Sequence, residues 1–277
     1  MAIPQPDSQA RTAHDAQLAP YGRLTEAAQW LAACQGSAPA QEPQRIRAIV
    51  FAEQEPQLPA PETAARRAEA GLNVVTVTDL SQAYDLGAAT ADAEIDAGAD
   101  LLIPGGVESA RVPAVVMATM TQTEPVVIVG KQPSVEDWKR EVSAIRDAMF
   151  RARNLEGMEL VASCQSAVLA AAVGLITRAA ERRTPLLIDA PLTATAALLA
   201  ERDNPGVKEW LFTTTLSTAP AHKLALEKLG LHPLMELGME PQPALGALAA
   251  VREALPRVPD GVQPGASWAD TVVTARC

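Results

Sequence analysis

The chain of 277 residues is long enough for one large α/β domain or two small ones. Its net charge of −10, from 23 basic and 33 acidic residues, disfavours binding to a nucleic-acid backbone because no basic segment stands out. Cys34, Cys164 and Cys277 lie far apart, and the 3 histidines show no metal-ligand spacing, so the sequence indicates neither a disulfide framework nor a metal site.

The N-terminal part divides into a polar segment and a helix. Residues 1–21 are rich in Pro, Gln and Asp, which predicts a flexible arm. They lack the basic start and apolar core of a signal peptide, so we expect a cytoplasmic protein. Residues 22–36 carry apolar side chains at helical spacing and end at a glycine, which predicts an amphipathic helix.

Short apolar runs then alternate with amphipathic segments. The runs that we predict to be strands are 46–51, 73–77, 100–106, 126–130, 185–189 and 210–214. This alternation is typical of a parallel sheet covered by helices. We predict an α/β fold with a Rossmann-like parallel sheet and an N-terminal helical segment. One domain is expected over residues 22–255, followed by an extended C-terminal tail over 256–277, where prolines replace periodicity.

Residues 161–177 are apolar enough to raise the question of a membrane helix. The segment is at the lower end of the ~17–25 residues that span a bilayer, and it contains Ser163, Gln165 and Ser166. We therefore predict one buried central helix and no membrane association. Its alanines and Gly174 would let neighbouring elements approach closely.

Candidate site residues follow the predicted strands, because ligands of open parallel sheets collect at the carboxyl ends of strands. Gly105 and Gly106 could let backbone N–H groups approach an anion, or could simply form a tight turn. Asp189 could hold ribose hydroxyls or cap the following helix, and Thr193 could also provide that cap.

A hydroxyl-rich segment, 213–218, precedes a further predicted helix. Ser217 and its neighbours could face an anion at that helix N-terminus. His222 in the same helix is a candidate general base by residue type, although a lone histidine in a helix more often has a structural role. Gly157 precedes another helix, whose first-turn Glu159 is already explained by the helix dipole.

The order and wording of these segments resemble the nicotinate-nucleotide:dimethylbenzimidazole phosphoribosyltransferase (CobT) family. Residues 22–36 (GRLTEAAQWLAACQG) are similar to GRLEELAxWLAxxQG, residues 185–198 (PLLIDAPLTATAAL) to PVVLDGFISTAAAL, and residues 217–239 (STAPAHKLALEKLGLHPLMELGM) to SAEPGHRxxLxxLGLxPLLDLGM. The resemblance implies a Rossmann-like core, usually in a homodimer, that transfers phosphoribose from nicotinate mononucleotide to a benzimidazole in cobalamin biosynthesis. It implies no metal and no other cofactor.

The same resemblance marks the chain as a divergent and shortened member of that family. Pro243 stands where the family's LGMRLGEGTGA, here LGMEPQPALGA, carries its glutamate base. FAEQEPQ at residues 51–57 replaces FAGDHGV, and Gly106 falls near the first glutamate of GEMGIGNTT. Glu141 takes the place of an expected lysine, which would disfavour a phosphate.

Three functions remain open on these grounds. The chain could be catalytically degenerate and bind a nucleotide, a phosphoribosyl ligand or a partner protein. It could instead be an active phosphoribosyltransferase with Glu53, Glu55 or Glu108 as a relocated base, since each follows a predicted strand. Finally, it could be the non-catalytic subunit of a hetero-oligomer in which a complete paralogue supplies the base. The ligand-binding candidates are Gly105, Gly106, Gly157, Asp189, Thr193, Ser217 and His222.

Overall fold

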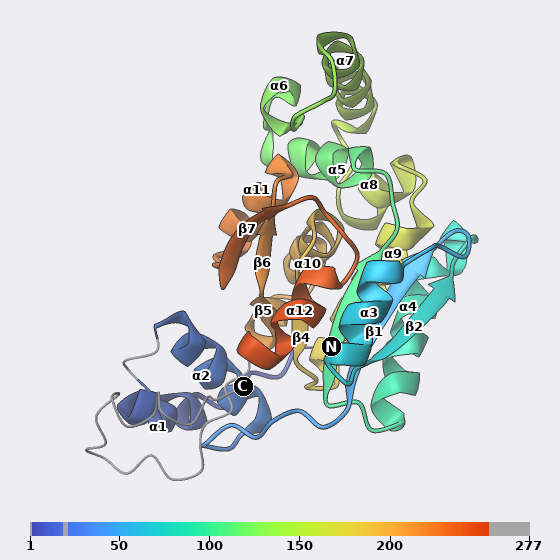
Figure 1. Cartoon of the computed structure of the whole chain (residues 1–277). Helices are drawn as coiled ribbons and strands as arrows, with labels where there is room; N and C mark the ends of the chain where they lie inside the picture. Colours follow the sequence, from blue (N-terminus) through green and yellow to red (C-terminus); the bar gives the residue numbers. More distant parts are fainter. Residues whose placement is uncertain (1, 19–21, 255–277) are drawn as a thin grey trace.

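A five-stranded parallel sheet with the order β2-β1-β3-β4-β5 forms the centre of the protein (Figure 1). The computed structural model describes residues 2–18 and 22–254, so the predicted tail at 256–277 lies outside the described residues. The strands are β1 (Ile46–Ala52), β2 (Gly71–Thr76), β3 (Leu101–Gly106), β4 (Leu186–Ile188) and β5 (Leu211–Thr213). The predicted α/β fold is thus confirmed, and these strands coincide with five of the six predicted runs.

Both faces of the sheet are buried because its strands are apolar on both sides. In β1, Ala48 and Val50 face one hydrophobic cluster, whereas Ile49 and Phe51 face the other. The first cluster contains side chains of α2 (Arg23–Gln35), α3 (Pro59–Arg67) and α12 (Leu245–Ala254). The second contains side chains of α4 (Leu80–Asp96), α9 (Ala167–Glu181) and α10 (Pro191–Asp203).

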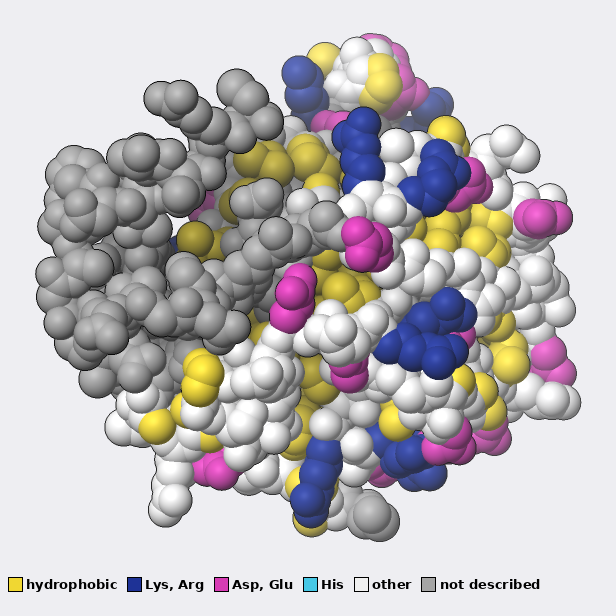
Figure 2. All heavy atoms as spheres, turned by 60° about the horizontal axis from the view of Figure 1, so that its bottom comes forward, with side chains coloured by type: hydrophobic (Ala, Val, Ile, Leu, Met, Phe, Trp, Pro, Cys, Tyr) yellow, Lys and Arg dark blue, Asp and Glu magenta, His cyan; other side chains and the backbone are white. Residues whose placement is uncertain are grey.

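Figure 2 shows basic and acidic side chains interspersed over the described part of one face, without a continuous basic patch. Ion pairs such as those of Arg178 and Arg182 with Asp92 contribute to this mixture on the surface. Among the helices that the structure describes, none combines the length and apolar character needed to cross a membrane.

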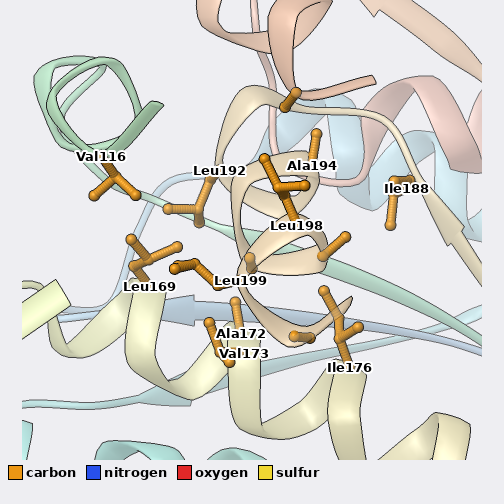
Figure 3. Close-up of a cluster of buried hydrophobic side chains, with 14 of the residues drawn as sticks. Val116, Leu169, Ala172, Val173, Ile176, Ile188, Leu192, Ala194, Leu198 and Leu199 are labelled. Carbon is orange, nitrogen blue, oxygen red and sulfur yellow. The ribbon is translucent and has the colours of Figure 1, made fainter. Parts of the chain in front are cut away.

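The α9 helix packs closely against two other helices. A side chain at Gly174 would overlap the carbonyl oxygen of Tyr84 in α4, and one at Gly87 in α4 would overlap that of Ala171. The close approach predicted around Gly174 is therefore confirmed. On another side, α9 and α10 share a packed set of aliphatic side chains, which holds α10 in place (Figure 3).

Two predictions of secondary structure from the sequence were wrong, one of a strand and one of a helix. Residues 126–130, predicted as a strand, begin with the short helix α6 (Pro125–Ile128); Val126 and Val127 are 47% and 61% exposed, so this apolar run is not a buried strand. Residues 161–177, predicted as one helix, belong to α8 (Gly157–Ser163) and α9. Gln165 adopts a positive φ of 54° and Ser166 caps α9, which breaks the helix there.

The N-terminal segment differs from the predicted flexible arm. Residues 8–18 form α1 (Ser8–Leu18), which packs beside α2. The indole N–H of Trp210 donates to the carbonyl oxygen of Pro4 at 2.8 Å, and Ile3 is only 6% exposed. Composition could not reveal this attachment, because its partner lies about two hundred residues away in the sequence.

The remaining elements lie toward one end of the sheet (Figure 1). They are α5 (Arg111–Thr121), α7 (Val135–Ala152), α11 (Pro220–Leu229) and a second sheet of β6 (Thr215–Ser217) and β7 (Met235–Met239). The one-turn helix η2 (Val207–Trp210) instead leads directly into the start of β5. The hydroxyl-rich segment thus contributes a short strand, which the sequence did not predict. The loop after β7 returns to the main sheet and leads into α12.

Candidate functional site

A cavity of about 560 Å³ lies at the carboxyl ends of β1, β3 and β4. Its walls come from four loops and helix starts, at residues 56–58, 106–110, 190–192 and 240–243, with Pro113. This is the edge at which parallel α/β sheets bind ligands, and the volume lies in the ~300–1,000 Å³ range of small-molecule sites. We call it the large cavity.

Glu108 is held in the wall of the large cavity by two hydrogen bonds. The hydroxyl of Ser166 donates to its Oε2, and the backbone N–H of Ser109 donates to Oε1 at 2.7 Å. Ser166 is 1% exposed and also accepts from the backbone N–H of Leu169 as the N-cap of α9. A rigid helix end therefore orients this carboxylate.

Gly105 and Gly106 end β3 and pack against buried neighbours. A side chain at Gly106 would overlap a methyl group of Leu192 and lie 2.8 Å from Cγ1 of Val168. One at Gly105 would lie 3.3 Å from the backbone nitrogen of Ala244. Close packing thus explains both glycines, although Gly106 also lines the large cavity.

Asp189 caps a helix, but not the one that follows it. Its Oδ2 accepts a hydrogen bond from the backbone N–H of Ala247 in α12 at 2.9 Å, while Oδ1 has no partner. Burial raises the pKa of this carboxyl to about 7, against the lowering effect of backbone N–H groups of α12 and the preceding residue. Asp189 thereby links the end of β4 to the loop that carries Pro243.

Thr193 takes part in the turn that opens α10. Its hydroxyl accepts from the backbone N–H of Ala190 at 3.2 Å and lies 3.0 Å from the carbonyl oxygen of the same residue. Thr193 is fully buried, and neither it nor Asp189 lines the large cavity. Both residues support the segment 190–192, and this segment lines the large cavity.

A second cavity, of about 200 Å³, adjoins the first, and we call it the small cavity. It is lined mainly by residues 128–132, the start of α5 and residues 218–221 at the start of α11. Arg111 and Glu141 both line it and form a two-point ion pair, with nitrogen to oxygen distances of 2.9 and 2.5 Å. Hydrogen bonding from Arg111 lowers the pKa of Glu141, so its charge is paired rather than free.

His222 and Ser217 contact each other beside the small cavity. The backbone N–H of Ser217 donates to Nδ1 of His222 at 3.1 Å, and the serine hydroxyl lies 3.0 Å from the same atom. Nδ1 is therefore the acceptor, which places the imidazole proton on Nε2. Burial lowers the pKa of His222 to about 4, so the ring is neutral at pH 7. Among the hydroxyls of segment 213–218, only that of Thr218 belongs to a residue lining the small cavity.

Of the candidate site residues from the sequence, only Gly106 and Glu108 belong to a cavity lining, and three of the others lie away from the cleft. Glu53 and Glu55 are exposed and belong to neither lining. Gly157 faces Asp203 at the last turn of α10, whereas the large cavity contacts the first turn. A helix of 13 residues separates these turns by roughly 20 Å.

Sequence reasoning missed three charged residues of the cavities: Arg111, Lys131 and Glu240. Glu240 lines both cavities, together with Ala110, Pro191 and Pro241. The only signal in the sequence was position, since Arg111 follows the strand-end segment of Glu108 and Glu240 precedes Pro243 by three residues. Within the described parts of the chain, no group of His, Cys, Asp and Glu is arranged to hold a metal ion.

A family model described as a phosphoribosyltransferase matches residues 63–253, more than half of the chain. A nicotinate-nucleotide–dimethylbenzimidazole phosphoribosyltransferase from Mycobacterium ulcerans (strain Agy99) is 34% identical over 88% of this chain and 86% of that protein. The chain belongs to this family. The CobT family enzyme of the same name from Corynebacterium glutamicum (strain ATCC 13032) is 43% identical over 67% of this chain and 52% of its own length.

The fold of this CobT family member also matches solved structures. The nicotinate-nucleotide–dimethylbenzimidazole phosphoribosyltransferase from Thermus thermophilus superimposes with a TM-score of 0.78 over 90% of this chain and 94% of that chain, at 24% identity. A structure of CobT from the same organism gives a TM-score of 0.75 at 23% identity. The chain spans about half the length of the Corynebacterium relatives that it matches.

Proposed function

We propose that this protein binds a phosphoribosyl nucleotide in the cleft formed by the two cavities and does not catalyse the family's transfer by itself. The observation that carries the proposal is the position of Pro243 in the wall of the large cavity. In the resemblance to LGMRLGEGTGA, this is the place of the glutamate base. A proline side chain cannot accept the proton that a benzimidazole must lose during transfer.

Neighbouring titratable groups are poorly suited to replace that base. The Nδ1 atom of His222 already accepts from Ser217, and the ring is fully buried. The Oδ2 atom of Asp189 accepts from Ala247, and its residue lines neither cavity. A base must lie within hydrogen-bond reach of the proton that it removes. The nearby buried groups therefore serve the scaffold in this proposal.

One observation favours an alternative in which the protein is active. Glu108 lines the large cavity, and Ser166 orients its carboxylate. A carboxylate in this place could act as the relocated base, whereas the exposed Glu53 and Glu55 lie outside the lining. The third hypothesis, a complete paralogue that supplies the base, stays a prediction about a hetero-oligomer.

Calorimetry and a transfer assay on the purified full chain separate these functions. We expect nicotinate or nicotinamide mononucleotide to bind, and no nicotinate to be released after 5,6-dimethylbenzimidazole is added. Binding of neither nucleotide would overturn the proposal. Transfer by the chain alone would also overturn it, and would support the relocated base if Glu108→Gln abolished transfer while Glu53→Gln and Glu55→Gln retained it. Transfer that appeared only with a second family member would support the paralogue.

A further inference from the structure

The charges of the two cavities differ, and the difference bears on which nucleotide the cleft prefers. The charged residues that line the large cavity are Glu108 and Glu240, and no described Arg, Lys or His lines it. The small cavity carries Arg111 and Lys131 against Glu141 and the shared Glu240. The larger space is thus purely anionic, and the basic side chains are confined to the smaller one.

The negative charge of the large cavity is not neutralised by its surroundings. Both hydrogen bonds to Glu108, from Ser166 and Ser109, are donated by neutral groups, which bring no positive charge. Neither Glu108 nor Glu240 forms an ion pair with another described residue. A further negative charge brought into this space by a ligand would therefore meet repulsion without a compensating cation.

The small cavity differs because its lining contains basic side chains as well as acidic ones. Lys131 forms no ion pair within the described part of the chain, and Arg111 is oriented by its two-point contact with Glu141. The first turn of α11 lines the same space, and the N-terminus of a helix favours an anion. This is the better place for the phosphate end of a nucleotide.

One ligand can occupy both cavities because they adjoin along Ala110, Pro191, Glu240 and Pro241. We infer that the cleft selects nucleotides whose base carries no negative charge: a pyridinium nucleotide with a carboxamide on the ring is preferred over one with a carboxylate. The phosphate lies in the small cavity and the base in the large cavity, facing Glu108 and Glu240. This inference rests on the proposed function.

Two commercially available nucleotides test the inference, because nicotinamide and nicotinate mononucleotide differ only in carboxamide against carboxylate. Calorimetry on the full chain at about 0.05 M salt should give a Kd about tenfold lower for the carboxamide nucleotide. The ratio should shrink at about 0.5 M salt, because the Debye length then falls to a few ångströms. Glu108→Gln and Glu240→Gln should each reduce the ratio, and the double variant should bring it near one.

The control is Asp85→Asn, which removes an exposed carboxylate from α4, outside both cavities, and should leave the ratio unchanged. Equal or tighter binding of the carboxylate nucleotide by the unaltered protein would overturn the inference alone. A ratio that did not respond to Glu108→Gln or Glu240→Gln, in variants with unchanged circular dichroism, would do the same. Absence of binding by both nucleotides would overturn the proposed function and this inference with it.

Discussion

The carboxylate of Asp189 at the end of β4 accepts a hydrogen bond from the backbone N–H of Ala247 in the first turn of α12, at 2.9 Å. Because α12 begins directly after the loop that lines the large cavity, this contact positions one wall of the cleft. Gly246 is required beside it, since a side chain there would overlap the hydroxyl of Thr215 and lie 3.2 Å from Oδ2 of Asp189.

Asp189 and His222 should give opposite pH dependences of stability. The pKa of Asp189 is raised from 3.8 to about 7, so its contribution to the free energy of unfolding falls as pH rises through this window. The pKa of His222 is lowered from 6.5 to about 4, so its contribution falls as pH decreases from 6.5. Between about pH 5 and about pH 6.5 the two effects oppose each other.

Urea denaturation of Asp189→Asn and His222→Gln at several pH values checks this pair. Relative to the unaltered protein, the free energy of unfolding of Asp189→Asn should increase by about 1.4 kcal/mol per pH unit as pH rises in that window. That of His222→Gln should decrease by a similar amount. Any constant offset reports lost contacts and does not affect the slopes. Parallel slopes for the two variants would contradict the assignment.

Gly87→Ala should destabilise the protein, although alanine is ordinarily the better helix former by about 1 kcal/mol. The new methyl group would overlap the backbone carbonyl of Ala171 and force α4 away from α9. We expect a loss of about 2 kcal/mol or more, measured by urea denaturation. The reverse change at exposed Ala89 on the same helix, Ala89→Gly, should cost only about 1 kcal/mol. A neutral Gly87→Ala would show that the helices can separate freely.

Gly106 and Leu192 should be energetically coupled. Gly106→Ala places a methyl group where a methyl of Leu192 lies, and we expect a loss of about 1–3 kcal/mol. Leu192→Ala removes that methyl but leaves a cavity. The double variant should be more stable than the sum of the single changes predicts, as a double-mutant cycle would measure. Strict additivity would show that Val168 or the backbone sets the limit instead.

Ser166→Ala should affect both stability and ligand binding. It removes the N-cap of α9, at a cost of about 1 kcal/mol, and the hydroxyl that orients Glu108. Asp79→Ala removes the N-cap of α4, whose carboxylate accepts from Ser81, at a site outside both cavities. We expect both variants to lose stability, but only Ser166→Ala to change the affinity for nicotinamide mononucleotide. If Asp79→Ala changed the affinity as much as Ser166→Ala, Ser166 would act only through helix stability.

The amino-acid sequence by itself determined the strands of the sheet and the helix at residues 22–36. Continuous apolar runs and apolar residues at helical spacing are local patterns that can be recognised in the sequence. It also located the strand ends where the large cavity lies, and it identified Gly106 and Glu108 among the lining residues. The predictions from the sequence were wrong where an apolar residue is exposed, as at Val127, and where the backbone leaves the helical conformation, as at Gln165.

Only the tertiary structure decided the partners of the site residues. Asp189 caps a helix that begins 56 positions later, Arg111 pairs with Glu141 across 30 positions, and Glu240 lines both cavities. Such contacts depend on how distant elements pack, and no short-range spacing encodes them. For that reason the family and the fold could be predicted from the sequence, whereas the distribution of charge within the cleft was decided by how the loops pack.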